Sequence, residues 1–245
     1  EAAKMASAVD VRMLTQSRLA TNITNGIIHA FKEYDASEII MGLHEKKTDG
    51  DKFWGIFTPD LVNQLNRQII LCRCNRPLNT LRRILVAVPS RVEFEQGFYR
   101  WIERLARLAE NLSCRIIFHG RIESTSLINE YIRNQHPGVR AEYVLMEHWK
   151  EFTQLAQQMS SDHMLVVISA RQGTVSYKPV FERLPLELYR HYHEHNLMVV
   201  FPDQNGQSPE DMTFTAPQHH SVDSAYSSIV NWVMKKIDKG RSDAS

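Results

Sequence analysis

The sequence predicts an α/β fold built on a parallel β-sheet, and three observations support this class. Residues 83–88 form a short continuous apolar run, which is typical of a strand buried on both faces of a sheet. Residues 94–112 carry apolar side chains at helical spacing, which predicts about five helical turns with one apolar face. Segments of these two kinds then alternate along the chain to residue 201, which predicts parallel strands connected by helices.

The elements follow one another as β-α-β-α-β-α-β-α-β. We expect a five-stranded parallel sheet with helices on both faces. The helix near 124–134 ends before Pro137 and Gly138, and the helix near 181–192 is expected despite Pro185. The expected strands are residues 83–88, 114–119, 139–146, 164–169 and 197–201, and the expected helices are residues 94–112, 124–134, 149–159 and 181–192.

An internal repeat organises the chain. Val11-Arg12 recurs as Val139-Arg140, which is a shift of 128 residues, and residues 69–72 match residues 197–200 at the same shift. Self-similarity at a fixed shift indicates two copies of one structural unit. At this shift the first strand of the first copy falls about 45 residues before residue 1, so we expect upstream sequence or another chain to complete it.

The repeat divides the chain into three expected regions. Residues 1–79 form the C-terminal part of a first repeat, and residues 80–204 form a complete second repeat. Residues 205–245 are expected to be a polar linker followed by an amphipathic helix. That helix packs back on the domain, pairs with a partner or lies on a membrane surface, and these alternatives remain open.

The composition excludes several classes of protein. Hydrophobic residues make up 43% and charged residues 23% of the chain, which is ordinary for a globular protein. The net charge of +1 gives no indication of a nucleic-acid partner. The longest apolar runs contain five residues, whereas a membrane span needs about 20. Three cysteines are too few for a disulfide framework, so we expect a reducing compartment.

The sequence contains no complete catalytic or metal-binding motif. His191-x-His193-x-His195 is the most metal-like cluster, but its position between a helix and a strand favours a polar loop. Cys72-x-Cys74 has no second pair of cysteines and therefore predicts no zinc site. No nucleophile elbow, Walker loop or His-Glu-x-x-His motif is present. We therefore expect no catalytic residue, no metal and no enzymatic activity.

Three segments resemble the universal stress protein family. They are the apolar strand at residues 84–88, the segment at residues 35–42 in the fourth-strand position, and the helix at residues 25–34 that precedes it. The resemblance covers roughly residues 5–204. It implies tandem three-layer α/β/α domains similar to the adenine nucleotide alpha hydrolases. For the second repeat we expect the strand order 3-2-1-4-5, with residues 83–88 at the centre.

The end of the second repeat resembles a more specific group. The segment Phe201-Pro202-Asp203-Gln204 is similar to the cytoplasmic tails of bacterial cation:proton antiporters, which carry tandem stress-protein-like domains. This resemblance implies a non-catalytic regulatory region of a monovalent cation (Na⁺ or K⁺):proton antiporter on the cytoplasmic side of the bacterial inner membrane. The implied partners are a membrane-embedded transporter domain of the same chain and a second copy in a homodimer. The alternative is a free-standing tandem universal stress protein that binds an adenine nucleotide.

The first repeat keeps only part of the family's nucleotide motif, Gly-x2-Gly-x9-Gly-[Ser/Thr]. Glycines there let backbone N–H groups approach phosphate oxygens. Gly42 and Gly55 fit the first and third positions, but Glu45 occupies the second and Ile56 replaces the hydroxyl residue, with Thr58 two residues later. Gly42, Gly55 and Thr58 are therefore the candidate remnant of a nucleotide site, and Glu45 is expected to repel a triphosphate.

The second repeat has lost this motif. Ser169, Gln172 and Glu182 occupy the three glycine positions, and Pro89 stands where the family tends to have an acidic residue. We therefore expect no nucleotide in the second repeat and weak or absent adenine nucleotide in the first, with no required cofactor.

Two further features suggest interactions. Residues 69–72 and 197–201 are the last strands of the two repeats, and we expect them to pair as a pseudo-twofold pair because a bare strand edge promotes aggregation. A basic cluster near the link between the repeats is either a solvated connector or a contact for phosphate, acidic lipid or the transporter. It contains Arg67, Arg73, Arg76, Arg82 and Arg83.

Overall fold

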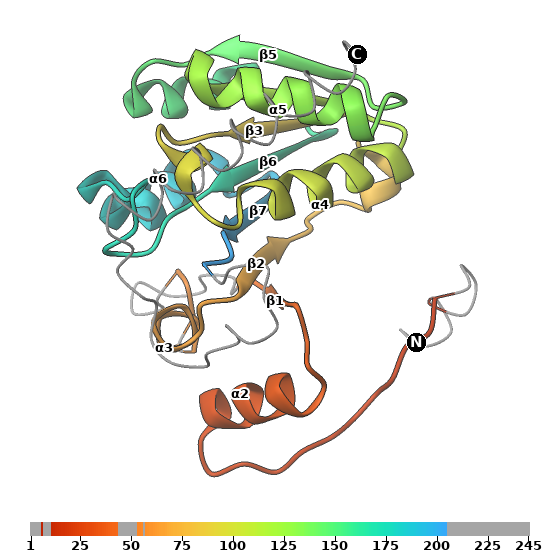
Figure 1. Cartoon of the computed structure of the whole chain (residues 1–245), viewed down its shortest axis with the longest axis vertical. Helices are drawn as coiled ribbons and strands as arrows, with labels where there is room; N and C mark the ends of the chain where they lie inside the picture. The colour runs from red at the N-terminus through yellow and green to blue at the C-terminus, as the bar shows by residue number, and fades with distance from the viewer. Residues whose placement is uncertain (1–5, 7–10, 44–52, 56, 205–245) are drawn as a thin grey trace, which may run out of the picture. The chain divides into compact units, whose positions relative to one another are not determined.

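The computed structural model describes residues 6, 11–43, 53–55 and 57–204 (Figure 1). The chain divides into two compact units, Glu1–Ala36 and Ser37–Ser245. In the first unit, helix α2 (Ile23–Glu33) begins where the Asn22 side chain accepts a hydrogen bond from the Asn25 amide, as expected of an N-cap. Arg18 forms an ion pair of 2.7 Å with Glu33 at the other end of that helix.

The described strands of the second unit form one seven-stranded sheet. Its strand order is β1-β2-β7-β6-β3-β4-β5 (Figure 1). The strands are β1 (Glu38–Gly42), β2 (Gln68–Arg73), β3 (Arg83–Ala87), β4 (Arg115–Gly120), β5 (Ala141–Leu145), β6 (His163–Ile168) and β7 (Asn196–Phe201).

The second repeat has the predicted strand order. Strand β3 lies at its centre and pairs in parallel with β4 on one side and β6 on the other. Strands β5 and β7 complete the order β5-β4-β3-β6-β7, which is 3-2-1-4-5 in chain order, and all of these pairings are parallel. β3 and β6 are buried along almost their whole length, as their continuous apolar sequences require.

The five strands expected for residues 80–204 are part of a larger sheet, which continues through β7 into β2 and β1. β2 pairs with β7 in the antiparallel direction, from Ile69 opposite Phe201 to Arg73 opposite Leu197. This is the expected pairing of the two last strands. β1 then pairs in parallel with β2, so the sheet has seven strands and changes direction once.

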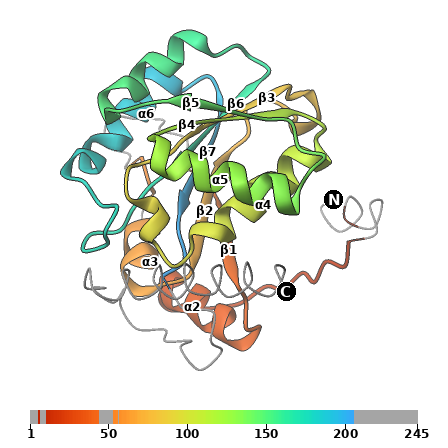
Figure 2. The ribbon, with the colours of Figure 1, turned by 45° about the horizontal axis from the view of Figure 1, so that its top comes forward.

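Helices cover both faces of the sheet. α4 (Phe98–Asn111) and α5 (Ile122–Gln135) lie on one face, and α6 (Leu184–Tyr192) lies on the other (Figures 1 and 2). The predicted helix at 149–159 is the 3-10 helix η3 (Trp149–Gln158) instead of an α-helix. The remaining short elements are α3 (Thr58–Gln64), η1 (Leu78–Thr80), η2 (Val92–Phe94) and η4 (Pro179–Arg183).

Each sheet face has its own apolar layer, because successive strand residues point to opposite faces. Ile84 and Val86 of β3 pack in a cluster with Phe98 and Trp101 of α4. On the α6 side, the rings of Phe152 and Tyr192 lie 5.1 Å apart, and the Tyr192 hydroxyl donates a hydrogen bond to the Phe152 carbonyl.

The division at residues 79/80 and 204/205 stays a prediction. Residues 205–245, including the expected C-terminal helix, lie outside the described part of the chain. Within the described residues, no helix has the length and the apolar character that crossing a membrane requires.

Candidate functional site

The loop that follows β6 is held closed by a carboxylate of the same chain. Glu95, in the connection after β3, accepts hydrogen bonds through Oε1 from the Ser176 amide at 2.9 Å and the Ser176 hydroxyl at 2.7 Å. Both residues are buried. In a nucleotide-binding loop, backbone amides of this kind bind phosphate oxygens. Here the Glu95 carboxylate already accepts the hydrogen bond of the Ser176 amide.

Arg171 fixes the same loop from the other side. Its side chain is buried and donates hydrogen bonds to three backbone carbonyls, those of Val62, Arg67 and Pro202. Burial lowers the pKa of Arg171 to about 9, so its guanidinium remains charged at neutral pH. The Arg171 guanidinium therefore links the loop after β6 to the chain before β2 and to the end of β7.

The three positions where the family motif has glycine also carry structural contacts. Ser169 is buried and its amide donates to the Val200 carbonyl at 2.8 Å. The Gln172 amide group contacts the Tyr177 hydroxyl at 3.4 Å, and that hydroxyl donates to Glu182 at 3.0 Å. Each of the three positions is therefore occupied by a residue with contacts inside the protein.

The remnant residues of the first repeat lie along the connection from β1 to α3. Gly42 ends β1, and a Cβ added there would meet nothing within 4 Å, so glycine is not required for space. Gly55 has φ 76°, a left-handed conformation that favours glycine. Thr58 is the buried first residue of α3. Glu45 and Ile56 lie outside the described residues, so the nucleotide remnant stays a prediction.

An ion-pair cluster around a buried carboxylate lies just beyond the end of β7. Asp203 is only 2% exposed, and its carboxylate contacts the guanidinium of Arg100 and lies 3.9 Å from Arg67. Burial lowers the pKa of Arg100, with the nearby Arg67 charge acting in the same direction. We call Asp203, Arg67, Arg100 and Arg171 the closed end of the β2–β7 pair.

The backbone at the closed end is also tightly packed. A Cβ added to Gly97 would lie 2.4 to 2.9 Å from backbone atoms of Asp203, closer than atoms can approach. The Gln204 amide donates to the Asn66 carbonyl at 2.7 Å. Residues 201–204 therefore form a seam that holds β7 against α4 and the chain that precedes β2.

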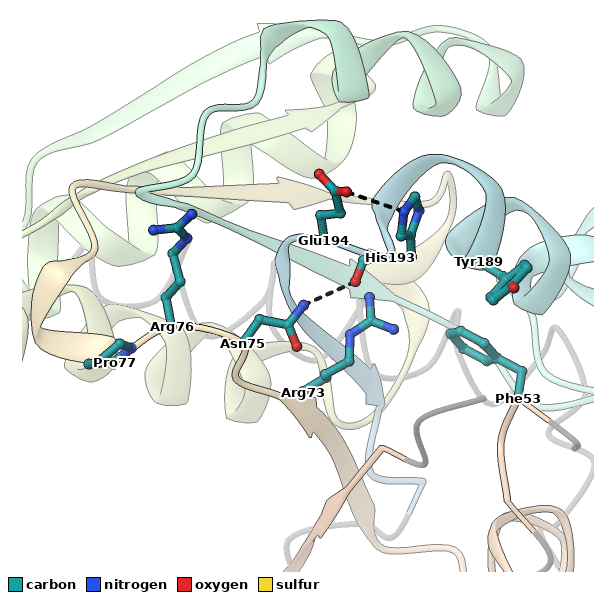
Figure 3. Close-up of a pocket in the computed structure, with 8 residues that line it drawn as sticks. All are labelled: Phe53, Arg73, Asn75, Arg76, Pro77, Tyr189, His193 and Glu194. Atoms are coloured by element: carbon teal, nitrogen blue, oxygen red, sulfur yellow. Dashed lines mark hydrogen bonds and ion pairs between the residues drawn. The ribbon is translucent and has the colours of Figure 1, made fainter. Parts of the chain in front are cut away.

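The opposite end of the β2–β7 pair is open. A pocket of about 690 Å³ lies where β2 ends and β7 begins (Figure 3). We call it the inter-repeat pocket. Its lining residues come from the β1–α3 connection, the end of β2, the following link and the end of α6: Phe53, Arg73, Asn75, Arg76, Pro77, Tyr189, His193 and Glu194.

Hydrogen bonds between the two repeats fix the frame of this pocket. The Arg73 guanidinium donates to the Tyr192 carbonyl at 2.7 Å, and the Asn75 side chain donates to the His193 carbonyl at 3.0 Å. The buried side chain of Asn196 accepts from the Arg76 amide at 2.9 Å and donates to the Arg76 carbonyl at 3.1 Å. The position of the Arg76 backbone is therefore fixed, while its side chain extends towards solvent.

Within the described residues, no group of three or more His, Cys, Asp or Glu side chains is arranged to hold a metal ion. His193 lines the inter-repeat pocket, and burial lowers the pKa of His195. Cys72 and Cys74 are free thiols, and burial raises the pKa of Cys72 to about 12.

The basic cluster seen in the sequence is divided by the fold. Arg67 is buried at the closed end, whereas Arg73 and Arg76 line the inter-repeat pocket. Arg82 is exposed and lies 3.6 Å from Asp162, and Arg83 is exposed at the start of β3. Sequence reasoning missed Phe53, Asn75 and Tyr189 in the pocket, and Glu95 and Arg171 in the closed loop. These residues belong to no motif. The pocket residues meet through the β2–β7 pairing, whereas Glu95 and Ser176 meet because β3 and β6 are neighbours in the sheet.

Comparison with solved structures identifies the fold. A universal stress protein from Archaeoglobus fulgidus DSM 4304 matches with a TM-score of 0.53 over 81% of this chain and 74% of that chain, at 13% identity. This is a universal stress protein fold. A functionally unknown protein from Pseudomonas aeruginosa PAO1 aligns over 82% of this chain and 76% of that chain, at 17% identity and a TM-score of 0.47. No family model and no curated protein matches the sequence.

Proposed function

We propose that this chain is a non-catalytic regulatory module of the universal stress protein type. One observation carries the proposal: in the second repeat, the Glu95 carboxylate holds the Ser176 amide, and Arg171 closes the same loop. A loop whose polar groups are already satisfied gains little by binding phosphate. The second repeat therefore serves as a rigid support and carries no reaction.

The more specific proposal is that this module regulates a monovalent cation (Na⁺ or K⁺):proton antiporter, as part of the same chain on the cytoplasmic side of the bacterial inner membrane. The support is the segment at residues 201–204, which resembles antiporter tails and forms the seam between the repeats. A regulatory module acts by binding a ligand or partner with different affinity in two states of the transporter. A homodimer is part of this proposal, since most soluble oligomers are twofold symmetric.

The alternative is a free-standing tandem universal stress protein that binds an adenine nucleotide in its first repeat. Gly55 favours it, because its left-handed backbone (φ 76°) stands at the third glycine position of the motif. Gly42 gives no such support, because nothing lies near a Cβ built there.

Calorimetry with ATP and Mg²⁺, AMP and NAD separates the two functions. The regulatory proposal expects no micromolar binding in the closed loop or at the remnant. Micromolar ATP binding would contradict the regulatory proposal and support the nucleotide binder under two conditions. Arg76→Gln should leave this binding unchanged, and Glu45→Gly should strengthen it by removing a negative charge.

The transporter proposal is tested by the sequence that precedes Glu1 in the gene. About a dozen apolar segments of about 20 residues there would support it, and a short polar extension would contradict it. In the full-length protein, removing residues 1–245 is expected to change how cation exchange responds to pH or ligand while exchange itself persists. Unchanged regulation would contradict the proposal.

A further inference from the structure

The inter-repeat pocket lies apart from the loop that follows β6 and from the seam at residues 201–204. Its volume of about 690 Å³ falls in the range of small-molecule sites. It lies beside β2, the last strand of the first repeat, whereas the family motif follows the fourth strand, β1. None of the remnant residues Gly42, Gly55 and Thr58 lines the pocket, although Phe53 comes from the same β1–α3 connection.

The charges that line the pocket favour an anion. Arg73 and Arg76 contribute two guanidinium groups, and Glu194 is the one carboxylate among the lining residues. Glu194 lies 3.6 Å from the His193 ring, and its side chain is 81% exposed, so water screens its charge. Arg76 is exposed and lines the pocket, so its guanidinium can reach a ligand there. Arginine presents a planar fork of donors that matches phosphate and carboxylate oxygens.

One wall of the pocket is aromatic. Phe53 extends from the β1–α3 connection and Tyr189 from α6, and both rings lie on the same side of the pocket (Figure 3). Phe53 is held by an edge contact with Trp54 at 5.0 Å, whereas Tyr189 is 40% exposed. An exposed ring beside a fixed ring offers a surface on which a flat group of a ligand can pack.

We propose that the inter-repeat pocket binds a small organic anion, a phosphate monoester that carries a flat ring. The phosphate contacts Arg76 and Arg73, and the ring packs against Tyr189 and Phe53. The concave shape favours a free small molecule over the surface of a membrane. The binding itself is a property of this chain, whereas its regulatory meaning rests on the proposed function.

Phenyl phosphate is a suitable probe because it combines the two features, while inorganic phosphate and phenol carry one each. We expect calorimetry to show saturable binding of phenyl phosphate, weaker binding of inorganic phosphate and no measurable binding of phenol. Arg76→Gln is expected to weaken phenyl phosphate binding about tenfold, the usual effect of losing one charged hydrogen bond. Arg82→Gln is the matched control, because this exposed arginine of the same sequence cluster does not line the pocket.

A second variant tests the aromatic wall. Tyr189→Leu is expected to weaken phenyl phosphate binding several-fold while leaving inorganic phosphate binding unchanged. The proposal is overturned if phenyl phosphate shows no saturable binding at millimolar concentration, or if Arg76→Gln and Arg82→Gln have equal effects.

Vesicles distinguish a free phosphate from a lipid headgroup. Flotation with phosphatidylglycerol vesicles is expected to leave the chain unbound. Binding to these vesicles that Arg76→Gln abolishes would overturn the small-molecule proposal in favour of a lipid surface. Calorimetry on this chain therefore tests the pocket alone. If phenyl phosphate does not bind, the pocket proposal fails, and the regulatory proposal is still tested separately in the full-length protein.

Discussion

The two ends of the β2–β7 pair use arginine for opposite purposes. At the closed end, Arg67 and Arg171 are buried, and their charges meet the Asp203 carboxylate and backbone carbonyls. At the open end, Arg73 and Arg76 line a pocket, and the Arg76 side chain is exposed. A buried cation must be compensated inside the protein, whereas an exposed cation can receive its counterion from outside.

The difference shows how an arginine-rich segment divides between stability and binding. Residues 67–83 form one basic cluster in the sequence. In the fold, Arg67 precedes β2 and Arg73 ends it, so the two arginines lie at opposite ends of the strand. The neighbours at each end then decide the role. Seam residues 201–204 supply a carboxylate at one end, and the end of α6 supplies aromatic and polar groups at the other.

The largest expected effect is the loss of the closed end's carboxylate. Asp203→Asn leaves the buried guanidinium of Arg67 without its counterion, which is expected to cost about 3–5 kcal/mol of unfolding free energy. Urea denaturation measures the change. Asp162→Asn is the control, because this partly exposed carboxylate faces Arg82 across 3.6 Å and is expected to cost less than about 1 kcal/mol. Equal losses would show that the closed end is not a buried charge cluster.

Gly97→Ala tests the packing of the same end. The new methyl group would collide with the Asp203 backbone, and we expect a loss of about 1–3 kcal/mol in thermal or urea unfolding. Gly42→Ala is the matched variant, since its methyl group meets nothing and its backbone is ordinary strand. We expect it to be neutral or stabilising by up to about 1 kcal/mol. The comparison fails if the two alanines have the same effect.

Arg76→Gln sharpens the comparison from the open end. Because its side chain is exposed and makes no ion pair with a described residue, unfolding free energy should change by no more than about 0.5 kcal/mol. A loss as large as that of Asp203→Asn would mean that the open end also stabilises the fold.

The smallest expected effect concerns thiol reactivity at the open end. Burial raises the pKa of both Cys72 and Cys74, and that of Cys72 to about 12. A raised pKa lowers the fraction of reactive thiolate at pH 8. Iodoacetamide labelling followed by mass spectrometry should therefore modify both more slowly than a free thiol, and Cys72 more slowly than Cys74. A faster reaction at Cys72 would show that β2 is less protected than described.

The sequence was sufficient for the sheet and insufficient for the sites. The strand at 83–88 was predictable because a continuous apolar run indicates a strand buried on both faces. The pairing of 69–72 with 197–201 was predictable because the repeat makes these two strands equivalent. The site residues were not, because Glu95 and Ser176, or Phe53 and Tyr189, are distant in sequence and become neighbours through tertiary packing. The 3-10 form of η3 was also missed, since helical periodicity does not separate it from an α-helix.

The short link at residues 74–82 joins the last strand of the first repeat to the centre of the second. Because of this link, β2 pairs with β7 of the same chain. A short tether gives such an intramolecular pairing an effective concentration on the order of millimolar. Pairing therefore does not depend on how much protein is present. Diluting the protein cannot separate the two repeats, and any self-association of the chain must use a surface other than these last strands.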